Sequence, residues 1–358
     1  MWIGLITAVV LLLVSGCGAA GSGSDSEATS RANTAGTPVV FSTDMAMGLT
    51  TGATNGTDET PSDVDDAWAY ALAVAEGGLD IRGVIVTMGN NMAAPEVAVA
   101  QRTVEAMDTD VPVVKGASVW LDDASSVSGD DIGTDGCVND GVLFLKEQAE
   151  QTPGLIVLAI GPMTDLACLA TQFPESVENL GGVVALIGSS PGPLVLDGKT
   201  LRDFNYVMDP TALHLLLEET NLDVTVIMFS VSSQGAIDTS SIEKLAESAN
   251  PRAAFFGEQS VPFAKFWTEA ISTTKPIWDA SVVWYQLRPD DLKCGPMGYK
   301  LKVGPPLQEQ GAVYDYFDTS YDSDRQVTAC YDWQSPGALA EFTKSVWQAV
   351  GGDGTPPN

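Results

Sequence analysis

Three carboxylates flank the end of the first predicted strand and the start of the first predicted helix. Asp44 follows the apolar run 38–41, and the adjacent Asp65 and Asp66 come after a Gly/Thr-rich excursion over residues 45–64. If that excursion loops back on itself, the three carboxylates gather at one edge of a sheet. Oxygen ligands without His or Cys suit calcium or magnesium and not zinc. The alternative is that the acidic pair only caps a helix N-terminus, where acids are favourable anyway.

Further polar blocks lie at the ends of later apolar runs or in the loops that follow them. They read Val86-Thr87-Met88-Gly89-Asn90, Ala159-Ile160-Gly161-Pro162-Met163-Thr164-Asp165, Arg202-Asp203-Phe204-Asn205 with Asp209-Pro210 soon after, and Ile277-Trp278-Asp279-Ala280. These blocks supply carboxylate, amide and aromatic side chains. Such groups bind sugars, bases and hard cations when a fold brings them together.

Short apolar, β-branched runs alternate with longer amphipathic stretches from residue 38 onward. The runs cover 38–41, 81–87, 155–160, 182–187 and 224–229, and helix-like stretches include 66–75, 95–107 and 210–219. This order predicts an α/β fold with an open, mostly parallel, Rossmann-like sheet and helices on both faces. Such a sheet places its ligand site at the carboxyl ends of its strands. After about residue 294 we expect a small C-terminal hairpin region and a final helix near 338–350.

The first 37 residues are predicted to lie outside the folded domain. An apolar run over 2–14 leads into Ser15-Gly16-Cys17, which resembles a bacterial lipobox with Cys17 as the lipidated residue. The alternative is a plain secretory signal or membrane anchor with an incidental cysteine. Residues 18–37 indicate a flexible tether, 38–350 one domain, and 351–358 a disordered tail. We therefore expect a protein of the cell envelope, lipid-anchored to the membrane on its extracytoplasmic side.

Charge and cysteine content narrow the choice of partners. The 358 residues include 17 basic and 47 acidic side chains, for a net charge of −30. Such a chain repels phosphate backbones, so we expect no nucleic-acid partner, and a neutral substrate or one held through a cation fits better. In an exported domain, the cysteines after residue 17 favour pairing with their sequence neighbours, Cys137 with Cys168 and Cys294 with Cys330. Free buried thiols are the alternative.

The polar blocks, in this order and spacing, resemble the inosine–uridine-preferring nucleoside hydrolase family over about residues 38–350. The resemblance implies calcium-dependent hydrolysis of the N-glycosidic bond of ribonucleosides, giving free base and ribose. It implies that carboxylates of Asp44, Asp66 and Asp279 hold the metal together with the backbone carbonyl of Ile160. Asp44 would be the general base. The expected assembly is either a homodimer or a homotetramer.

The resemblance also implies which residues bind the substrate. Asp65 and Asn90 would contact the ribose 2′-hydroxyl, Asn205 the 3′-hydroxyl, and Asp203, in place of the family's Glu, the 5′-hydroxyl. Trp278 stands where many members have His, and so resembles a purine-leaning branch in which indoles stack on the base. Trp120 is expected as the second face of that sandwich. For both indoles, an ordinary core or loop aromatic is the alternative.

The sequence departs from the family pattern near the first metal loop. The insertion 45–64 must leave and re-enter this loop, where it would form a lid or narrow the pocket. Ser42 replaces the family's opening Asp, and Asp197 replaces an Asn, which weakens the expectation of family-like 5′-hydroxyl recognition. The favoured function is a purine-leaning ribonucleoside hydrolase for purine salvage. The alternative is a catalytically silent, lipid-anchored protein that captures nucleosides for a transporter.

Overall fold

The structure, a computed structural model, describes residues 36–50, 60–121, 136–189, 194–303, 315–318 and 325–354. The predicted signal peptide, Cys17, almost all of the predicted tether and the last four residues of the predicted tail lie outside these ranges. Among the described helices, none has the length and apolar character needed to cross a membrane.

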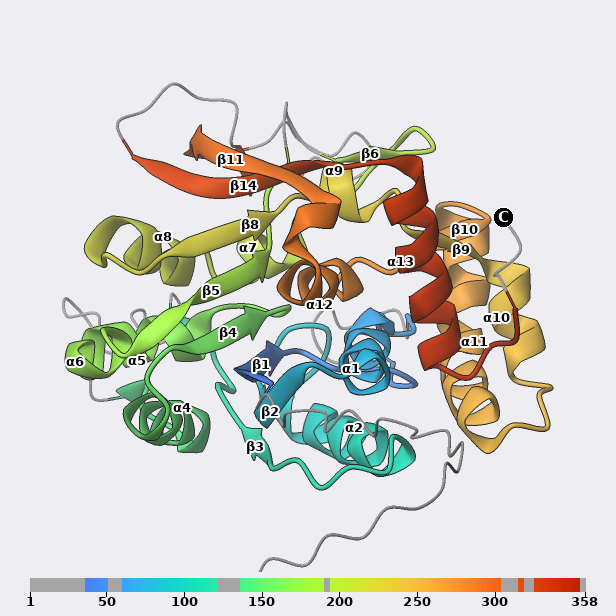
Figure 1. The fold of residues 1–358 in the computed structure, drawn as a ribbon, viewed down its shortest axis with the longest axis horizontal. Helices are drawn as coiled ribbons and strands as arrows, with labels where there is room; N and C mark the ends of the chain where they lie inside the picture. Colours follow the sequence, from blue (N-terminus) through green and yellow to red (C-terminus); the bar gives the residue numbers. More distant parts are fainter. Residues whose placement is uncertain are drawn as a thin grey trace, which may run out of the picture. The chain divides into compact units, whose positions relative to one another are not determined.

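A mostly parallel sheet of eight strands forms the centre of the fold (Figure 1). Its order is β11-β14-β8-β5-β4-β1-β2-β3, and the pairing of β11 with β14 at one edge is antiparallel. The bounds are β1 Thr37–Thr43, β2 Leu79–Val86, β3 Val113–Lys115, β4 Leu155–Ala159, β5 Leu180–Leu186, β8 Val224–Ile227, β11 Leu292–Gly298 and β14 Gln326–Trp333. Short strands pair outside this sheet: β6 Val195–Leu196 with β7 Lys199–Thr200, β9 Ala236–Asp238 with β10 Thr274–Pro276, and β12 Lys300–Val303 with β13 Asp315–Asp318.

Helices cover both faces of the sheet. Their bounds are α1 Asp65–Glu76, α2 Ala93–Ala106, α4 Asp140–Gln151, α5 Thr164–Gln172, α6 Pro174–Val177, α7 Phe204–Met208, α8 Pro210–Glu219, α9 Phe229–Ser232, α10 Thr239–Leu245, α11 Pro251–Ala270, α12 Ala280–Leu287, the 3₁₀ turn η2 Pro289–Asp291 and α13 Pro336–Ala349. Along β1, Val39 and Phe41 pack in a core with α1, α2 and α11–α13, whereas Val40 packs in a second core with α4, α5 and α8. Because successive side chains point to opposite faces, both sides of the strand are apolar.

The predicted α/β class with a mostly parallel sheet is confirmed, and the stretch 210–219 coincides with α8. Two details differ from the prediction. The apolar run 224–229 is not one strand, because β8 ends at Ile227 and α9 begins at Phe229. The expected C-terminal hairpin region is present as the antiparallel pairs β11–β14 and β12–β13, but it is not separate from the central sheet, because β14 also pairs in parallel with β8.

The favoured disulfide pairing is confirmed. Cys137 bonds to Cys168 on α5, and Cys294 on β11 bonds to Cys330 on β14. The first bridge therefore ties the segment before α4 to α5. The second bridge ties together the two strands at the edge of the sheet.

Candidate active site

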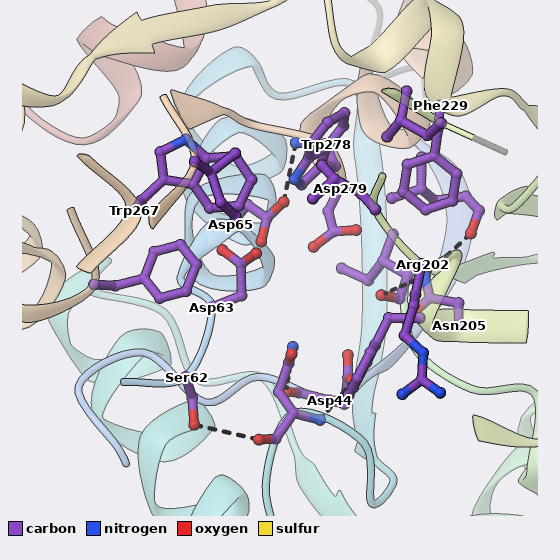
Figure 2. Close-up of a pocket in the computed structure, with 18 of the residues that line it drawn as sticks. Asp44, Ser62, Asp63, Asp65, Arg202, Asn205, Phe229, Trp267, Trp278 and Asp279 are labelled. Atoms are coloured by element: carbon purple, nitrogen blue, oxygen red, sulfur yellow. Dashed lines mark hydrogen bonds between the residues drawn. The ribbon is translucent and has the colours of Figure 1, made fainter. Parts of the chain in front are cut away.

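The carboxyl ends of β1, β2, β4 and β5 meet around a cavity of about 470 Å³ (Figure 2). The helices α1 and α12 begin at the same edge. The lining residues are Asp44, Pro61, Ser62, Asp63, Asp65, Asn90, Ile160, Leu186, Leu194, Thr200, Leu201, Arg202, Phe204, Asn205, Phe229, Phe263, Phe266, Trp267, Ile271, Trp278 and Asp279. Most of the predicted site residues are therefore gathered in one place by the sheet, as the carboxyl-edge rule for parallel strands requires.

Three buried carboxylates form a tight cluster at the floor of the site. Oxygens of Asp65, Asp66 and Asp279 all lie within 4.8 Å of one another, and none of the three residues is more than 4% exposed. Burial raises the pKa of Asp66 and of Asp279 well above the usual value, and the charges of neighbouring carboxylates raise it further. Like charges this close and this buried are costly unless a cation or protons compensate them.

Asp44 adds a fourth carboxylate, and one of its oxygens has no hydrogen-bond partner among the described residues. Oδ2 accepts a hydrogen bond of 2.8 Å from the backbone N–H of Asn90. Oδ1 is buried and has no hydrogen-bond partner among the described residues. Burial, followed by the charge of Glu96, raises the pKa of Asp44. An ionised, otherwise unpaired oxygen beside three more carboxylates is a good ligand for a hard divalent cation.

Two glycines make room for the Asp44 carboxylate. A Cβ atom on Gly89 would lie 2.0 Å from Oδ2 of Asp44, and one on Gly161 would lie 2.7 Å from its backbone nitrogen. Hydrogen bonds fix the same loop, because the backbone N–H groups of Ile160 and Gly161 both donate to the carbonyl of Ser42. The ends of β1 and β4 are therefore held together around Asp44.

Polar side chains link the other predicted metal ligands to the predicted ribose contacts. The Thr43 hydroxyl donates to Asp66, and the amide of Asn90 donates to Asp66 over 3.3 Å. The amide of Asn205 donates to the carbonyl of Ile160 over 3.2 Å and to that of Leu186 over 3.0 Å. The residues predicted for metal and for ribose thus lie in direct contact with one another.

An aromatic wall forms the opposite side of the cavity. Trp278 is 6% exposed, and its ring centroid lies 5.5 Å from that of Phe229 and 6.4 Å from that of Trp267. Phe263 and Phe266 of α11 line the same side. The backbone N–H of Trp278 donates to Asp65 over 2.9 Å, and this hydrogen bond links the aromatic wall to the carboxylate cluster.

Two predicted substrate-binding residues do not line the cavity. Asp203 caps α7: its carboxylate accepts from the backbone N–H of Tyr206, 3.2 Å away, and from that of Gly188, 2.7 Å away. Burial raises the pKa of Asp203 to about 7 despite these hydrogen bonds. Trp120 lies outside the lining as well, and Arg202 lines the cavity in the vicinity of Asp203 instead. The roles assigned to Asp203 and Trp120 thus stay predictions that the geometry does not favour.

The insertion 45–64 does return to the point where it leaves. Thr50 and Pro61 form an antiparallel bridge, and the backbone N–H of Ser62 donates to the carbonyl of Leu49. The returning residues Pro61, Ser62 and Asp63 line the cavity. This closure brings Asp44 and the Asp65–Asp66 pair together, and it places residues of the insertion in the cavity lining. Residues 51–59 of the insertion are outside the described residues, so the expectation of a lid is not tested.

Two buried ionisable residues at the site were not predicted from the sequence. Lys275 is 0% exposed and forms ion pairs with Asp63 and Asp65. Glu96 is also 0% exposed, and burial raises its pKa to about 9. A lysine next to Pro276 in the block before Trp278 gave no periodic or motif signal of its own. Glu96 was hidden within an ordinary helix pattern.

Solved structures of similar fold include several nucleoside hydrolases. A plant nucleoside hydrolase aligns with a TM-score of 0.64 at 18% identity, covering 87% of this chain and 98% of that one. A purine-preferring ribonucleoside hydrolase from Gardnerella vaginalis aligns with a TM-score of 0.64 at 17% identity, covering 87% of this chain and 99% of that one. At such identities the likeness establishes the fold alone.

Two relatives found by sequence are also named as nucleoside-cleaving enzymes, and each aligns with this chain over part of its length. A probable uridine nucleosidase 2 of Arabidopsis thaliana is 28% identical over 216 residues, which is 55% of this chain and 66% of the relative. A non-specific ribonucleoside hydrolase of Klebsiella pneumoniae is 29% identical over 175 residues, 43% of this chain and 54% of the relative. The chain thus matches just under two thirds and about half of the lengths of these two relatives. The family model for inosine-uridine preferring nucleoside hydrolases matches residues 57–336, and the chain belongs to that family.

Proposed function

We propose that this chain hydrolyses the N-glycosidic bond of ribonucleosides with the help of bound calcium, and that it prefers purine ribonucleosides. The observation that carries the proposal is Oδ1 of Asp44, which has no hydrogen-bond partner in the described part of the chain and is buried beside three clustered carboxylates at the floor of an aromatic-walled cavity. Family membership and the names of the relatives support the reaction class.

The residues present fit a divalent cation. Asp44, Asp66, Asp279 and the backbone carbonyl of Ile160 would hold it, and their hard oxygens suit calcium. When bound, the cation would polarise a water molecule and the ribose hydroxyls. The raised pKa values of the clustered carboxylates support this fit, because a cation offsets the repulsion that raises them.

The protein side chains then perform the proton transfer and hold the sugar. Asp44 accepts a proton from the attacking water, since its Oδ1 has no competing donor among the described residues. Cleavage of the C1′–N bond gives the ribose positive, oxocarbenium-like character, which nearby carboxylates stabilise more than they stabilise the neutral substrate. Asn90, Asp65 and Asn205 would bind the ribose hydroxyls.

The preference for purines rests on the aromatic wall. Trp278 and Trp267 both offer indole surface to the cavity, and Figure 2 shows Trp267 on the side away from Asn205. A two-ring base covers more of such a surface than a one-ring base does, and stacking strength follows the covered area. The names of the relatives differ in base preference, from uridine to non-specific, so this part of the proposal depends on the residues of this chain.

We also propose that Cys17 carries a lipid that anchors the protein to the membrane on its extracytoplasmic side. The lipobox-like sequence before Cys17 and the Gly/Ser-rich stretch after it support this placement. In cell fractionation, the wild-type protein should sediment with membranes and Cys17→Ser should not. A Cys17→Ser protein that stays with the membrane would contradict lipid anchoring.

The test of the reaction is chromatographic. The protein is incubated with calcium and, separately, inosine, guanosine, adenosine, uridine and cytidine, and free base is measured. We expect faster base release from the purine nucleosides, and its loss on addition of a chelator. Calcium binding without base release from any nucleoside would favour the catalytically silent binding protein instead.

A further inference from the structure

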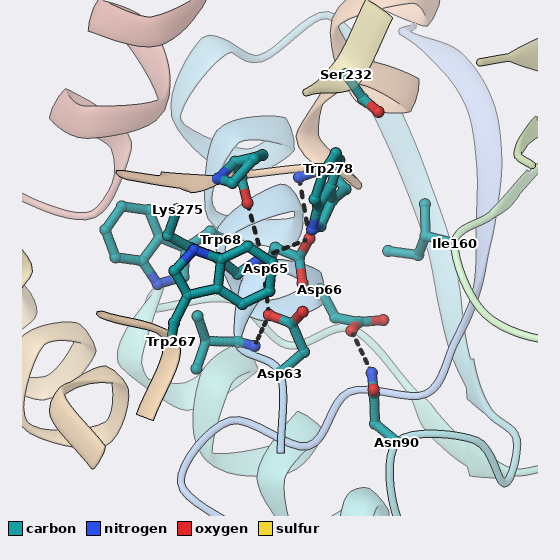
Figure 3. A network of polar contacts seen from close by, with 12 residues as sticks. Asp63, Asp65, Asp66, Trp68, Asn90, Ile160, Ser232, Trp267, Lys275 and Trp278 are labelled. Carbon is teal, nitrogen blue, oxygen red and sulfur yellow. Dashed lines mark hydrogen bonds and ion pairs between the residues drawn. The ribbon is translucent and has the colours of Figure 1, made fainter. Parts of the chain in front are cut away.

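A fully buried lysine lies directly behind the lining of the cavity (Figure 3). The ammonium of Lys275 lies 3.0 Å from Oδ1 of Asp63 and 3.6 Å from Oδ2 of Asp65, and it donates to the carbonyl of Pro276 over 2.7 Å. Its side chain is 0% exposed. A buried charge of this kind is tolerated only where partners compensate it, so the position of the ammonium is closely defined.

Aromatic rings surround the same ammonium. Its nitrogen lies 5.0 Å from the ring centroid of Trp267, 5.4 Å from that of Trp278 and 5.5 Å from that of Phe263. Each contact is within the range of cation–π attraction. Lys275 thus connects the two indoles of the wall to the segment of the insertion that carries Asp63.

Asp63 is a carboxylate that lines the cavity and has no role in the proposed reaction. Its side chain is 22% exposed, whereas that of Asp65 is 4% exposed. Lys275 and the backbone N–H of Val64, 2.7 Å away, both contact Oδ1. Figure 2 shows Asp63 on the side of Trp267, away from Asn205 and Arg202. If Asn205 and Asp65 bind the ribose, Asp63 lies next to Asp65 on the side of Trp267, where it can face the base.

We propose that Asp63, held in place by Lys275, selects the leaving base by accepting a hydrogen bond from an N–H group of that base. This inference rests on the proposed function. A carboxylate is an acceptor without donors when ionised, so it favours bases that present N–H at the facing edge and disfavours those that present a lone pair there. Lys275 touches no substrate in this account and acts as a positioning residue.

The residue proposed to select the base lies in the insertion 45–64 and is held in place from two sides. Asp63 belongs to the returning segment of residues 60–64, which is closed by the Thr50–Pro61 bridge. Lys275 belongs to β10, whose pairing with β9 fixes its backbone opposite Ile237. A carboxylate fixed from both sides loses little freedom when a base binds, so its hydrogen bond contributes strongly to discrimination.

The test compares inosine, whose base carries an N–H at ring position 1, with purine riboside, which has a lone pair there. The ratio of kcat/KM for inosine to that for purine riboside is measured in the wild type, in Asp63→Asn and in Lys275→Met. We expect the ratio to fall about 10- to 100-fold in Asp63→Asn, because the amide can present a donor to the base. Lys275→Met should lower the ratio in the same direction, because it releases Asp63.

Asp332→Asn is the matched control. Asp332 pairs with Lys293 over 2.7 Å on the surface, away from the cavity lining, and its loss should leave the ratio unchanged. Thermal melting confirms that each variant is folded. A general structural defect would lower both kcat/KM values equally, so an unchanged ratio in folded Asp63→Asn overturns the proposal.

Binding separates this inference from the proposed function. If the wild type cleaves neither nucleoside, the same ratio is taken from dissociation constants measured by tryptophan fluorescence, since Trp267 and Trp278 line the cavity. A tighter complex with inosine that loses its advantage in Asp63→Asn still supports the assignment. A wild type that neither cleaves nor binds either nucleoside overturns both proposals, whereas one that cleaves them with no change in Asp63→Asn overturns this one alone.

Discussion

Replacement of Gly161 by alanine tests the position of Asp44 with one added methyl group. Gly161 follows the predicted metal ligand Ile160, and its added Cβ would lie 2.7 Å from the backbone nitrogen of Asp44, 2.9 Å from the carbonyl carbon of Thr43 and 3.0 Å from Oδ1 of Asp44. Two of these three atoms belong to the backbone, which cannot rotate away as a flexible side chain can. The loop after β1 must therefore move.

The size of the movement follows from the contact itself. Ordinary van der Waals contact begins at 3.4 Å, so the Asp44 nitrogen must retreat by about 0.7 Å, on the scale at which overpacking costs about 1–3 kcal/mol of folding free energy. Displacement of a reacting group by about 1 Å can lower turnover about 100-fold. We therefore expect Gly161→Ala to stay folded, to lose at least about 10-fold in calcium affinity and to lose about 100-fold in kcat.

The assay combines calorimetric titration with calcium, inosine hydrolysis and thermal melting. Gly295→Ala is the matched control, because an added Cβ at Gly295 would meet nothing within 4 Å. The control should bind calcium and hydrolyse inosine like the wild type. Wild-type calcium affinity and turnover in Gly161→Ala would refute the reasoning that Asp44 and the loop after β4 are mutually positioned for catalysis.

Three further predictions concern charge, base binding and stability. Burial raises the pKa of Glu96 from 4.5 to about 9, so the stability tied to its proton is fully present below pH 4.5 and is lost as the pH rises through 9. With a chelator present, the free energy of unfolding measured in urea should therefore fall with rising pH in the wild type, relative to Glu96→Gln, by up to about 1.4 kcal/mol per pH unit between pH 4.5 and 9. Parallel pH profiles of the two proteins would contradict this. Trp278→Ala should raise KM about 10-fold for inosine and less for uridine, and equal increases would argue against stacking. Replacing Cys294 and Cys330 by serine removes a disulfide whose cysteines are 36 residues apart in sequence, and it should lower the free energy of unfolding in urea by about 4 kcal/mol. Turnover should be kept, because the bridge lies at the edge of the sheet; a loss of turnover in the folded variant would contradict the independence of the bridge from the site.

The general form of the fold could be predicted because the strands are apolar on both faces. In β1, residues on either side of the strand enter different cores, so the apolar run has no polar interruption. The end of β8 could not be predicted in the same way. Phe229 continues the apolar run in sequence but begins α9 and lines the cavity, so its apolar character serves the site and not the strand.

The grouping of Asp44, Asp65 and Asp66 was predicted from local sequence. The metal roles of Asp279 and Ile160 and the ribose role of Asn90 were implied by the family resemblance. Asp44, Asn90 and Ile160 each lie just after a parallel strand, and the topology brings such positions to a common edge. Asp203 differs, because it follows β7 of the antiparallel β6–β7 pair. Its carboxylate accepts from the backbone N–H of Gly188, after β5, and from that of Tyr206, in the first turn of α7. Capping by Asp is common at helix starts, and no sequence pattern decides between capping and ligand binding.

The base side of the site depends on contacts between distant parts of the chain. Lys275 pairs with Asp63 across more than 200 residues, and the rings of Phe263 and Trp267 come from a helix whose pattern also fits an ordinary core. Each of these residues has a common structural explanation when taken alone. Their proposed roles become apparent only when the fold places the lysine, the carboxylate and the indoles around one cavity.

The most direct test of the central claim is to follow base release during calcium titration of the metal-free protein. Calcium occupancy is measured by calorimetry on the same preparation, and free hypoxanthine from inosine is measured by chromatography. The account predicts that hydrolysis is absent without the metal and rises along the occupancy curve. Hypoxanthine release at full rate from the metal-free protein, or full occupancy without release, would contradict it.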